Sequence, residues 1–149
     1  MYDHQIIPQT IVKSNSFTGL MTLYESNFLK LIDFVPEFTN LEGEHIASSK
    51  EENDVIFSIT KKEKHTIFFS MSYIFKDKVS IELRPNLKIV VYLDGQLAQV
   101  TDIDETQECS NFNKIISPHK YIINQLWRKN IIFNKWLEHL IDLNYKLNF

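Results

Sequence analysis

The most informative part of the sequence is VIFSITKKEKHTIFFSMSYIFKDKVSIELRPNLKIVVYLDGQLAQV, residues 55–100. Apolar side chains occupy nearly every odd position from Val55 to Val91. They are Val55, Phe57, Ile59, Ile67, Phe69, Met71, Tyr73, Phe75, Val79, Ile81, Leu83, Leu87, Ile89 and Val91. Successive side chains of a strand point to opposite faces, so a period of two predicts strands with one buried face. We therefore expect an antiparallel meander of four or five strands.

The turns between these strands set the expected register. An odd number of loop residues keeps the odd positions on one face. Lys62-Glu63-Lys64 and Lys76-Asp77-Lys78 both satisfy this condition. They predict the facing pairs Phe57–Phe69, Val55–Met71, Tyr73–Ile81 and Met71–Leu83.

The last hairpin and a proline complete the predicted meander. Asp94-Gly95 indicates a type I′ turn, whose two central residues need positive φ. Pro85 cannot donate a backbone hydrogen bond, so it should bend or split the segment 79–93. The turn at Asp94-Gly95 predicts the apolar pairs Val91–Ala98 and Ile89–Val100.

One amphipathic helix is predicted before the meander. Ser16 or Thr18 can cap its start, and Pro36 ends it, because the residue before a proline avoids the helical conformation. Polar residues fill one side of the helix. The other side carries apolar residues at helical spacing, namely Phe17, Leu20, Met21, Tyr24, Phe28, Leu31, Ile32 and Val35.

A second, long helix is predicted over residues 118–145, with Ser117 as its cap and Pro118 in its first turn. A helix of that length would span about 42 Å, whereas the radius of gyration expected for the domain is about 15 Å. Either the helix bends near Arg128-Lys129-Asn130 or its end overhangs. An overhanging end would expose an apolar interface, through which two copies of the chain could form a homodimer. The residues of this interface would be Trp136, Leu137, Leu140 and Ile141.

Length and pattern together predict a single domain. The 149 residues, 44% of them hydrophobic, suffice for one core. Residues 1–15 show no periodicity and are expected to form an extended arm, and residues 16–149 a two-layer α+β domain. Residues 37–53 and 102–117 are expected to be loops, with a short strand at His45–Ala47.

The net charge and the absence of targeting segments indicate which partners and which cellular location to expect. A net charge of −3 without a clustered basic surface argues against nucleic acid and against an anionic membrane. No apolar run is long enough to span a bilayer, and the N-terminus has no secretory signal. The lone Cys109 fits a reducing compartment. We expect a bacterial cytoplasmic protein.

Motifs for catalysis, metals or cofactors are absent from the sequence. Its isolated glycines form no phosphate-binding loop, its five histidines have no zinc spacing, and no nucleophile elbow is present.

Asn27 and Asn124 fall near the predicted buried sides of the two helices, where an amide must be hydrogen-bonded. Either each ties its helix to the backbone of a strand or loop, or both line a small polar pocket with Glu25.

The order of several short motifs resembles the YqiB-like family of uncharacterised bacterial proteins. The motifs are Leu23-Tyr24-Glu25-Ser26-Asn27-Phe28, the run Val90-Val91-Tyr92-Leu93-Asp94, Ala98-Gln99-Val100, Ile123-Asn124-Gln125 and Trp136-Leu137. The spacing between the last two motifs is larger here than in the family. The resemblance implies no activity. It implies that Glu25, Asn27, Tyr92, Asp94 and Asn124 belong to the family's pattern, and these are the candidate residues for binding a ligand or partner.

Three functions remain open from sequence. The first is a non-catalytic binding or protein-interaction module with an unknown protein partner. The second is a small-ligand binder with a cavity between the sheet and the C-terminal helix. The third is an enzyme with Glu25 as acid or base, which would require an enclosed carboxyl group. We expect the first, without cofactor or metal.

Overall fold

The computed structural model describes residues 16–50, 52–76, 81–104 and 118–148. The expected arm at 1–15, the cap Ser117 and the lone Cys109 lie outside this part of the chain. The elements, in order, are α1 (Phe17–Phe34), η1 (Phe38–Asn40), β1 (Glu44–Ser48), β2 (Val55–Lys62), β3 (Thr66–Lys76), β4 (Ile81–Tyr92), β5 (Leu97–Asp104), α2 (Pro118–Asp142) and β6 (Lys146–Asn148).

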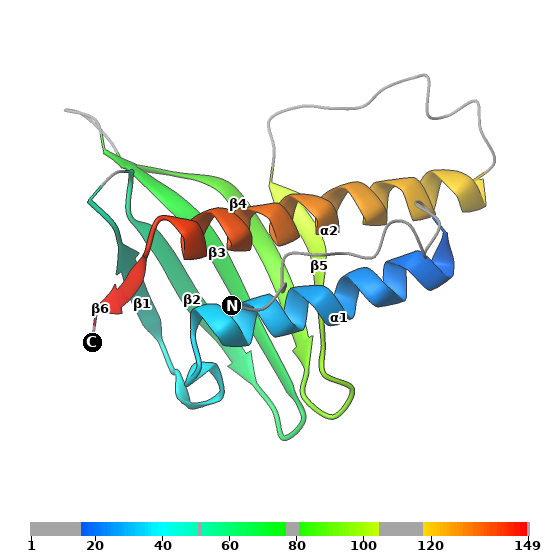
Figure 1. Ribbon diagram of the computed structural model, residues 1–149, viewed down its shortest axis with the longest axis horizontal. Coiled ribbons are helices and arrows are strands. Elements are labelled where there is room, and N and C mark those ends of the chain that lie inside the picture. The colour runs from blue at the N-terminus through cyan, green and yellow to red at the C-terminus, as the bar shows by residue number, and fades with distance from the viewer. Residues whose placement is uncertain (1–15, 51, 77–80, 105–117, 149) are drawn as a thin grey trace.

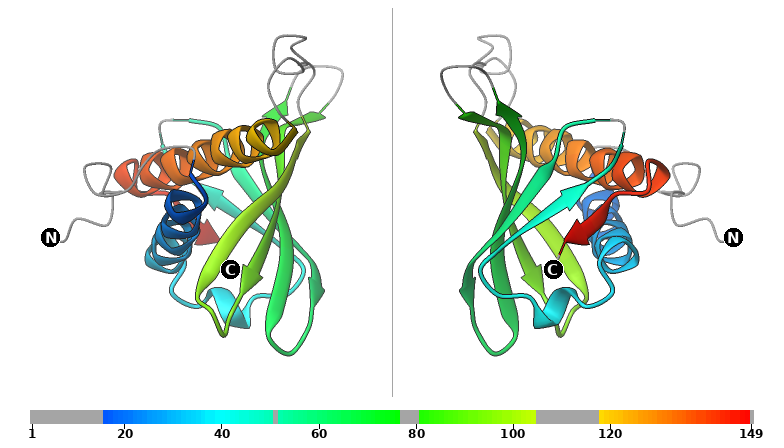
Figure 2. Two further views of the ribbon diagram at one scale, coloured as in Figure 1. Left: turned by 90° about the vertical axis from the view of Figure 1, so that its right-hand side faces the viewer. Right: turned by 90° about the vertical axis from the view of Figure 1, so that its left-hand side faces the viewer.

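The strands form one antiparallel sheet in the order β5-β4-β3-β2-β1-β6. Both helices lie against the same face of this twisted sheet, and no helix covers the other face (Figures 1 and 2). The predicted α+β fold, with a helix at each end of the meander, is confirmed. The sheet has six strands rather than four or five, because β6 returns after α2 and pairs with β1. A strand of three residues is too short to show a period.

The predicted pairing of β2 with β3 is wrong by two residues. The hairpin turn is tighter than expected, since the Glu63 N–H donates to the Thr66 carbonyl at 2.8 Å. A β-bulge at Thr60 then adds one residue to β2 and returns the odd positions to a common face. The observed pairs are Val55–Tyr73, Phe57–Met71 and Ile59–Phe69.

The predicted pairing of β3 with β4 is also wrong: Tyr73 faces Arg84 instead of Ile81, a shift of three residues that is already present where Lys76 faces Ile81, and a bulge at Pro85 adds one residue more. The register shifts where Pro85 and Asn86 together face Ser72. A bulge tolerates a residue that cannot donate to the ladder, and the Ser72 hydroxyl donates to Asn86 Oδ1 at 2.9 Å. Pro85 therefore bends β4 without ending it. The observed pairs include Met71–Leu87, Tyr73–Arg84 and Lys76–Ile81.

The predicted pairing of β4 with β5 is confirmed, but the turn is different. Val91 faces Ala98 and Ile89 faces Val100. Four residues, 93–96, connect the strands, and the positive φ falls on Gln96 at 57°. Gly95 does not adopt positive φ, so the turn is not of type I′. The Asp94-Gly95 signal therefore located the hairpin correctly and gave the wrong turn conformation.

The helices start and end close to the predicted positions. The Ser16 side chain accepts a hydrogen bond from the Gly19 N–H and caps α1. α2 is one continuous helix ending at Asp142, three residues earlier than predicted. The overhang occurs at the opposite end from the predicted one: the N-terminal halves of both helices extend past β5, while the C-terminal half of α2 lies over the sheet (Figure 1).

The core fills the space between the helices and the sheet. Phe57 and Phe69, from neighbouring strands, stack with ring centroids 5.9 Å apart, and Phe38 packs edge-on against Phe69 at 5.0 Å. All three rings are at most 2% exposed. A smaller cluster of Leu20, Leu23 and Tyr24 lies under the overhanging part of α1. The main core therefore anchors the C-terminal half of each helix.

Candidate functional site

Five buried or half-buried polar side chains join α1, α2 and β5 through the core. We call them the polar network: Asn27, Lys30, Asn130, Asn134 and Glu138. Asn27, Lys30, Asn130 and Asn134 are all 0% exposed. Buried polar groups must be hydrogen-bonded, and every one of these side chains has a partner inside the chain.

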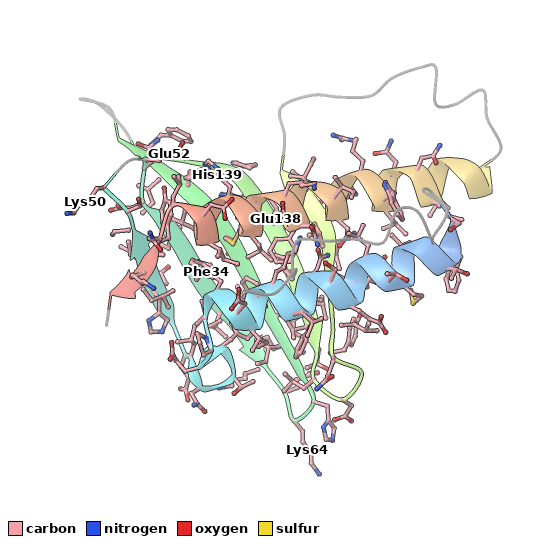
Figure 3. The ribbon with its side chains drawn as sticks, in the orientation of Figure 1. Phe34, Lys50, Glu52, Lys64, Glu138 and His139 are labelled. Carbon is pink, nitrogen blue, oxygen red and sulfur yellow. The ribbon has the colours of Figure 1, made fainter. Side chains whose placement is uncertain are left out.

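Lys30 occupies one end of the polar network. Its ammonium group donates to Asn134 Oδ1 at 2.6 Å and to the carboxylate of Glu138. Figure 3 shows Glu138 on the side of α2 that faces α1. Burial lowers the pKa of Lys30, and the hydrogen bond that its ammonium group donates to Glu138 opposes this shift. Because Glu138 is 18% exposed, this ion pair is the only part of the network with contact to solvent.

Asn27 and Asn130 occupy the other end and bind the backbone of β5. Asn130 Oδ1 accepts from the Val100 N–H at 2.7 Å, and its Nδ2 donates to the Val100 carbonyl at 3.4 Å. Asn27 Nδ2 donates to the Ala98 carbonyl at 3.1 Å. β5 is an edge strand, and an edge strand presents unpaired backbone groups. The two amides satisfy these groups as a neighbouring strand would.

Asn134 links the two ends. Its Nδ2 donates to Asn27 Oδ1 and to the Ser26 hydroxyl, both at 3.0 Å, while its Oδ1 accepts from Lys30. Each side-chain nitrogen and oxygen of Asn27, Lys30, Asn130 and Asn134 thus has at least one hydrogen-bond partner within the chain. A fully satisfied buried network rigidifies a core and specifies one arrangement of its elements. Its geometry fits a structural role, holding α1 and α2 against β5.

A second polar cluster lies where the C-terminal end of α2 meets the β1–β2 connection. We call it the Glu52 site: Glu52, Tyr73, Trp136 and His139. Glu52 Oε1 accepts from His139 Nε2 at 3.0 Å and from the Tyr73 hydroxyl at 3.3 Å. Figure 3 shows Glu52 beside His139. The hydrogen bond from His139 lowers the pKa of Glu52, which keeps the carboxylate charged.

Aromatic side chains form the inner side of the Glu52 site. The rings of Tyr73 and Trp136 are 4.8 Å apart. Burial raises the pKa of Tyr73, and the Trp136 indole next to it acts in the opposite direction. Trp136 Nε1 nevertheless has no partner with full hydrogen-bond geometry among the described residues. This N–H is the one buried side-chain donor there that remains unsatisfied.

The comparison with known families gives one match. Residues 30–146 match the family described as protein of unknown function, DUF1249. The chain belongs to the DUF1249 family. No curated protein and no solved structure matches. The narrower resemblance to YqiB-like proteins stays a prediction.

The DUF1249 match includes most of the polar network. It begins at Lys30 and contains Asn130, Asn134 and Glu138, whereas Asn27 lies just before it. The whole Glu52 site also falls inside the match. The Glu52 site and all of the polar network except Asn27 are therefore located in the part of the chain that matches the family.

The structure does not bring the sequence-predicted site residues of this DUF1249 protein together. Asn27 is buried in the polar network, but Glu25 is exposed on α1 and Asn124 is half-buried on α2. Tyr92 is 40% exposed at the end of β4. Asp94 lies in the adjoining turn, where its carboxylate is 3.1 Å from His65 Nδ1. A shared pocket of Glu25, Asn27 and Asn124 does not form.

The residues predicted as an interface lie in the core. Trp136, Leu137 and Leu140 are at most 8% exposed and Ile141 is half-buried. They pack against the sheet because the C-terminal half of α2 covers it and does not overhang. A homodimer through this helix stays a prediction, and these buried side chains do not offer it an exposed surface.

Sequence reasoning missed four members of the polar network, although a signal for three of them was present. Asn130, Asn134 and Glu138 follow each other at intervals of four, which places them on one stripe of a helix. That stripe runs beside the buried Phe133 and Leu137. Lys30 had no comparable signal, because a lysine three residues after Asn27 looks like any solvated helix position.

Two further properties of the described residues concern membrane spans and metal ions. No described helix is long and apolar enough to cross a membrane. No group of three or more His, Cys, Asp or Glu side chains in the described ranges could hold a metal ion.

Proposed function

We propose that this DUF1249 protein is a non-catalytic cytoplasmic interaction module that binds a partner protein on the uncovered face of its sheet. We call this surface the open face and define it by Ile46, Ile56, Phe68, Val90 and Tyr92. The observation that carries the proposal is that these residues stand at the even positions of their strands, opposite the buried odd positions, on the face of the sheet that neither helix covers (Figure 2).

The register places these side chains in two groups, because Ile56 faces Ser72, four residues along β3 from Phe68. Ile46 pairs with Ile56, and Phe68 pairs with Val90. Ile46 is 37% and Tyr92 is 40% exposed. Exposed apolar surface with a polar border is typical of protein interaction sites, and Lys61 lies over the Phe68 ring at 5.7 Å from its centroid.

The other surfaces of the sheet fit binding less well. The backbone groups of Ala98 and Val100 on β5 are already bound by Asn27 and Asn130, which disfavours strand addition there. β6, at the opposite edge, has only three residues. A partner is therefore expected to contact the face of the sheet and not its edges.

The two alternative functions have less support. A ligand cavity between the sheet and α2 would need space that Phe57, Phe69 and Leu137, each at most 2% exposed, fill with their own side chains. An enzyme with Glu25 as acid or base would need that carboxyl in an enclosed site. Glu25 is exposed on α1.

Site-specific photo-crosslinking in cells tests the proposal. A photoreactive amino acid replaces Phe68 or Tyr92 on the open face, or Leu29, which is 61% exposed on α1, as the control. We expect one common partner to be crosslinked from both open-face positions and not from position 29. The substitution Tyr92→Glu in purified protein should then weaken that complex at least tenfold with an unchanged free energy of unfolding. Crosslinks from position 29 alone, or an unaffected complex, would reject the open face.

A further inference from the structure

The ends of both helices that extend past β5 carry exposed apolar side chains. Phe17, at the start of α1, is 65% exposed, and Ile122, near the start of α2, is 56% exposed. β5 is the edge strand on this side of the sheet, and both helices continue beyond it (Figure 1). Neither residue belongs to the open face, so this surface can be considered independently of the proposed partner site.

Helical spacing places both side chains on the side of their helix that faces the sheet. Phe17 precedes the buried Phe28 by eleven residues, and Ile122 precedes the buried Phe133 by eleven residues. Eleven residues make about three turns of an α-helix, so each pair lies on one side of its helix. Phe28 and Phe133 belong to the main core. Phe17 and Ile122 therefore continue the core-facing sides of α1 and α2 beyond the edge of the sheet.

Two half-buried side chains extend this apolar surface. Met21 and Leu126 pack against the smaller core cluster that lies under the overhanging part of α1. We call the combined surface the overhang surface and define it by Phe17, Met21, Ile122 and Leu126. Apolar side chains that are exposed together mark a contact site, so the overhang surface is expected to be covered by a further apolar segment.

The residues that precede α1 contain such a segment. Residues 1–15 lie outside the described part of the chain and lead directly to Ser16, which caps α1 one position before Phe17. They include Gln5-Ile6-Ile7-Pro8-Gln9-Thr10-Ile11-Val12, eight residues with four branched apolar side chains and no charge. Transfer of such side chains from water to an apolar surface is favourable.

The tether between this segment and α1 has a suitable length. Val12 is four and Ile6 is ten residues before Ser16, so the two can reach at most about 14 and about 34 Å from the start of α1. The overhanging stretch from Phe17 to Leu23 is only about 9 Å long. A short tether gives an effective concentration in the millimolar range. A segment of the same chain therefore has an advantage over a separate molecule in covering this surface.

We propose that residues 6–12 of the same chain pack against the overhang surface and cover Phe17 and Ile122. The contact is made by apolar side chains and not by strand pairing with β5, because Asn130 already binds both backbone groups of Val100. The segment thereby shields apolar surface that would otherwise favour contact with a second copy of the chain.

Disulfide trapping in the full-length protein tests the proposed contact. Cysteines are introduced by Gln9→Cys in the segment and by Ile122→Cys on the overhang surface, with Cys109→Ser removing the native thiol. In the control pair, Arg128→Cys replaces Ile122→Cys, because Arg128 is exposed two residues after Leu126 and thus on another side of α2. We expect an intrachain disulfide between positions 9 and 122 to form at least about tenfold faster than one between positions 9 and 128, at a rate independent of protein concentration.

A pair of variants then tests whether the apolar side chains make the contact. Ile6→Ser with Ile11→Ser should lower the trapping rate at position 122 to that at position 128. In the otherwise unmodified chain it should also speed amide hydrogen exchange of residues 20–24 about tenfold, since these amides lose part of their cover. Gln9→Ser, a polar exchange in the same segment, should leave this hydrogen exchange unchanged.

Three results would overturn the proposal. Equal trapping at positions 122 and 128 would show that the segment has no preference for the overhang surface. Disulfide-linked dimers in place of the intrachain product would show that a second copy covers this surface. Trapping and hydrogen exchange that do not respond to Ile6→Ser with Ile11→Ser would show that the apolar side chains make no contact.

Discussion

Lys30 is the residue whose environment departs most from that of an ordinary helix position. Its side chain is 0% exposed, and its ammonium group binds Asn134 and Glu138. Removing a charge from water is costly unless the charge is paired and hydrogen-bonded. The pair with Glu138 offsets this cost, so the stability of the helix pair depends on both partners being present.

Substitution of Lys30 tests this dependence. Lys30→Met keeps the length of the side chain but leaves Glu138 and Asn134 Oδ1 without their donor, so unfolding should become easier by about 3 kcal/mol. The free energy of unfolding is measured by urea titration. Lys135→Met is the control, because Lys135 is 55% exposed and 3.7 Å from Glu138. Its effect on the free energy of unfolding should stay within about 0.5 kcal/mol.

The double variant Lys30→Met, Glu138→Met should be more stable than Lys30→Met alone, since a buried pair can be replaced by apolar groups. Simple additivity of the two losses would contradict the pairing.

Tyr145 makes stability depend on pH at the alkaline end. Its pKa is about 12 in the folded protein, against 10.0 as the reference value. Between these values the unfolded chain loses the proton and the folded protein keeps it, so the unfolded state binds fewer protons and stability falls as pH rises. The contribution is complete below pH 10 and is lost as pH rises through about 12. Tyr145→Phe should flatten the decline of the unfolding free energy over this range. A decline as steep as that of the parent protein would show that other groups cause it.

At the scale of elements, the edge strand β5 explains why the core contains so many amides. An exposed strand edge can pair with another chain. Here, Asn130 binds both the N–H and the carbonyl of Val100, and Asn27 binds the carbonyl of Ala98. The helices therefore replace a missing strand neighbour with side-chain amides.

Loss of Asn130 should release this edge. Asn130→Leu leaves the Val100 backbone groups without partners, which should cost about 3 kcal/mol of stability and promote concentration-dependent self-association through β5. Urea titration measures the first effect and sedimentation velocity the second. Asn124→Leu, a half-exposed position of the same helix, is the control and should change neither. A variant that stays monomeric and as stable as the parent protein would show that Asn130 does not protect the edge.

The elements also show how far the sequence determines the fold. The period of two in residues 55–91 predicted which face of each strand is buried, and Phe57 and Phe69 are in the core as expected. The register was not predictable in the same way, because the turns set other pairs than expected, as at Lys76–Ile81, and because bulges at Thr60 and opposite Ser72 each shift the pairing by one residue more. A bulge adds one unpaired residue to a strand, so the pairing beyond it is shifted by one position. Nothing in the composition of a strand marks where a bulge lies. Only Pro85 gave a local signal.

The candidate sites were less predictable because they depend on distant segments. Asn27 and Asn130 are hydrogen-bonded to each other across 103 positions of the chain. Glu52 and His139 are separated by 87 positions. In the sequence, Glu52 and His139 each resemble an ordinary polar surface position. The contacts that give these residues a role arise from the path of the two helices over the sheet.

At the scale of the whole molecule, the helix pair is attached unevenly to the sheet. The C-terminal half of α1 contributes Phe28 and Leu31 to the main core, whereas Leu20, Leu23 and Tyr24 belong to the smaller cluster, against which Leu97 of β5 packs. The polar network lies between these two regions and joins them. Segments with fewer buried apolar contacts open at lower free energy, so the overhanging ends should open before the core does.

Native-state hydrogen exchange should therefore reveal two levels of protection along each helix. Amides of residues 20–24 in α1 and 126–131 in α2 are expected to exchange by openings of lower free energy than amides of residues 28–34 and 133–140. The central strands β2, β3 and β4 should exchange only by global unfolding, because the buried rings of Phe57 and Phe69 hold them together. Asn130→Leu should widen the gap, since it removes a connection between the overhang and β5. Equal protection along both helices would mean that the smaller cluster is as firmly held as the main core, and that the two layers unfold as one unit.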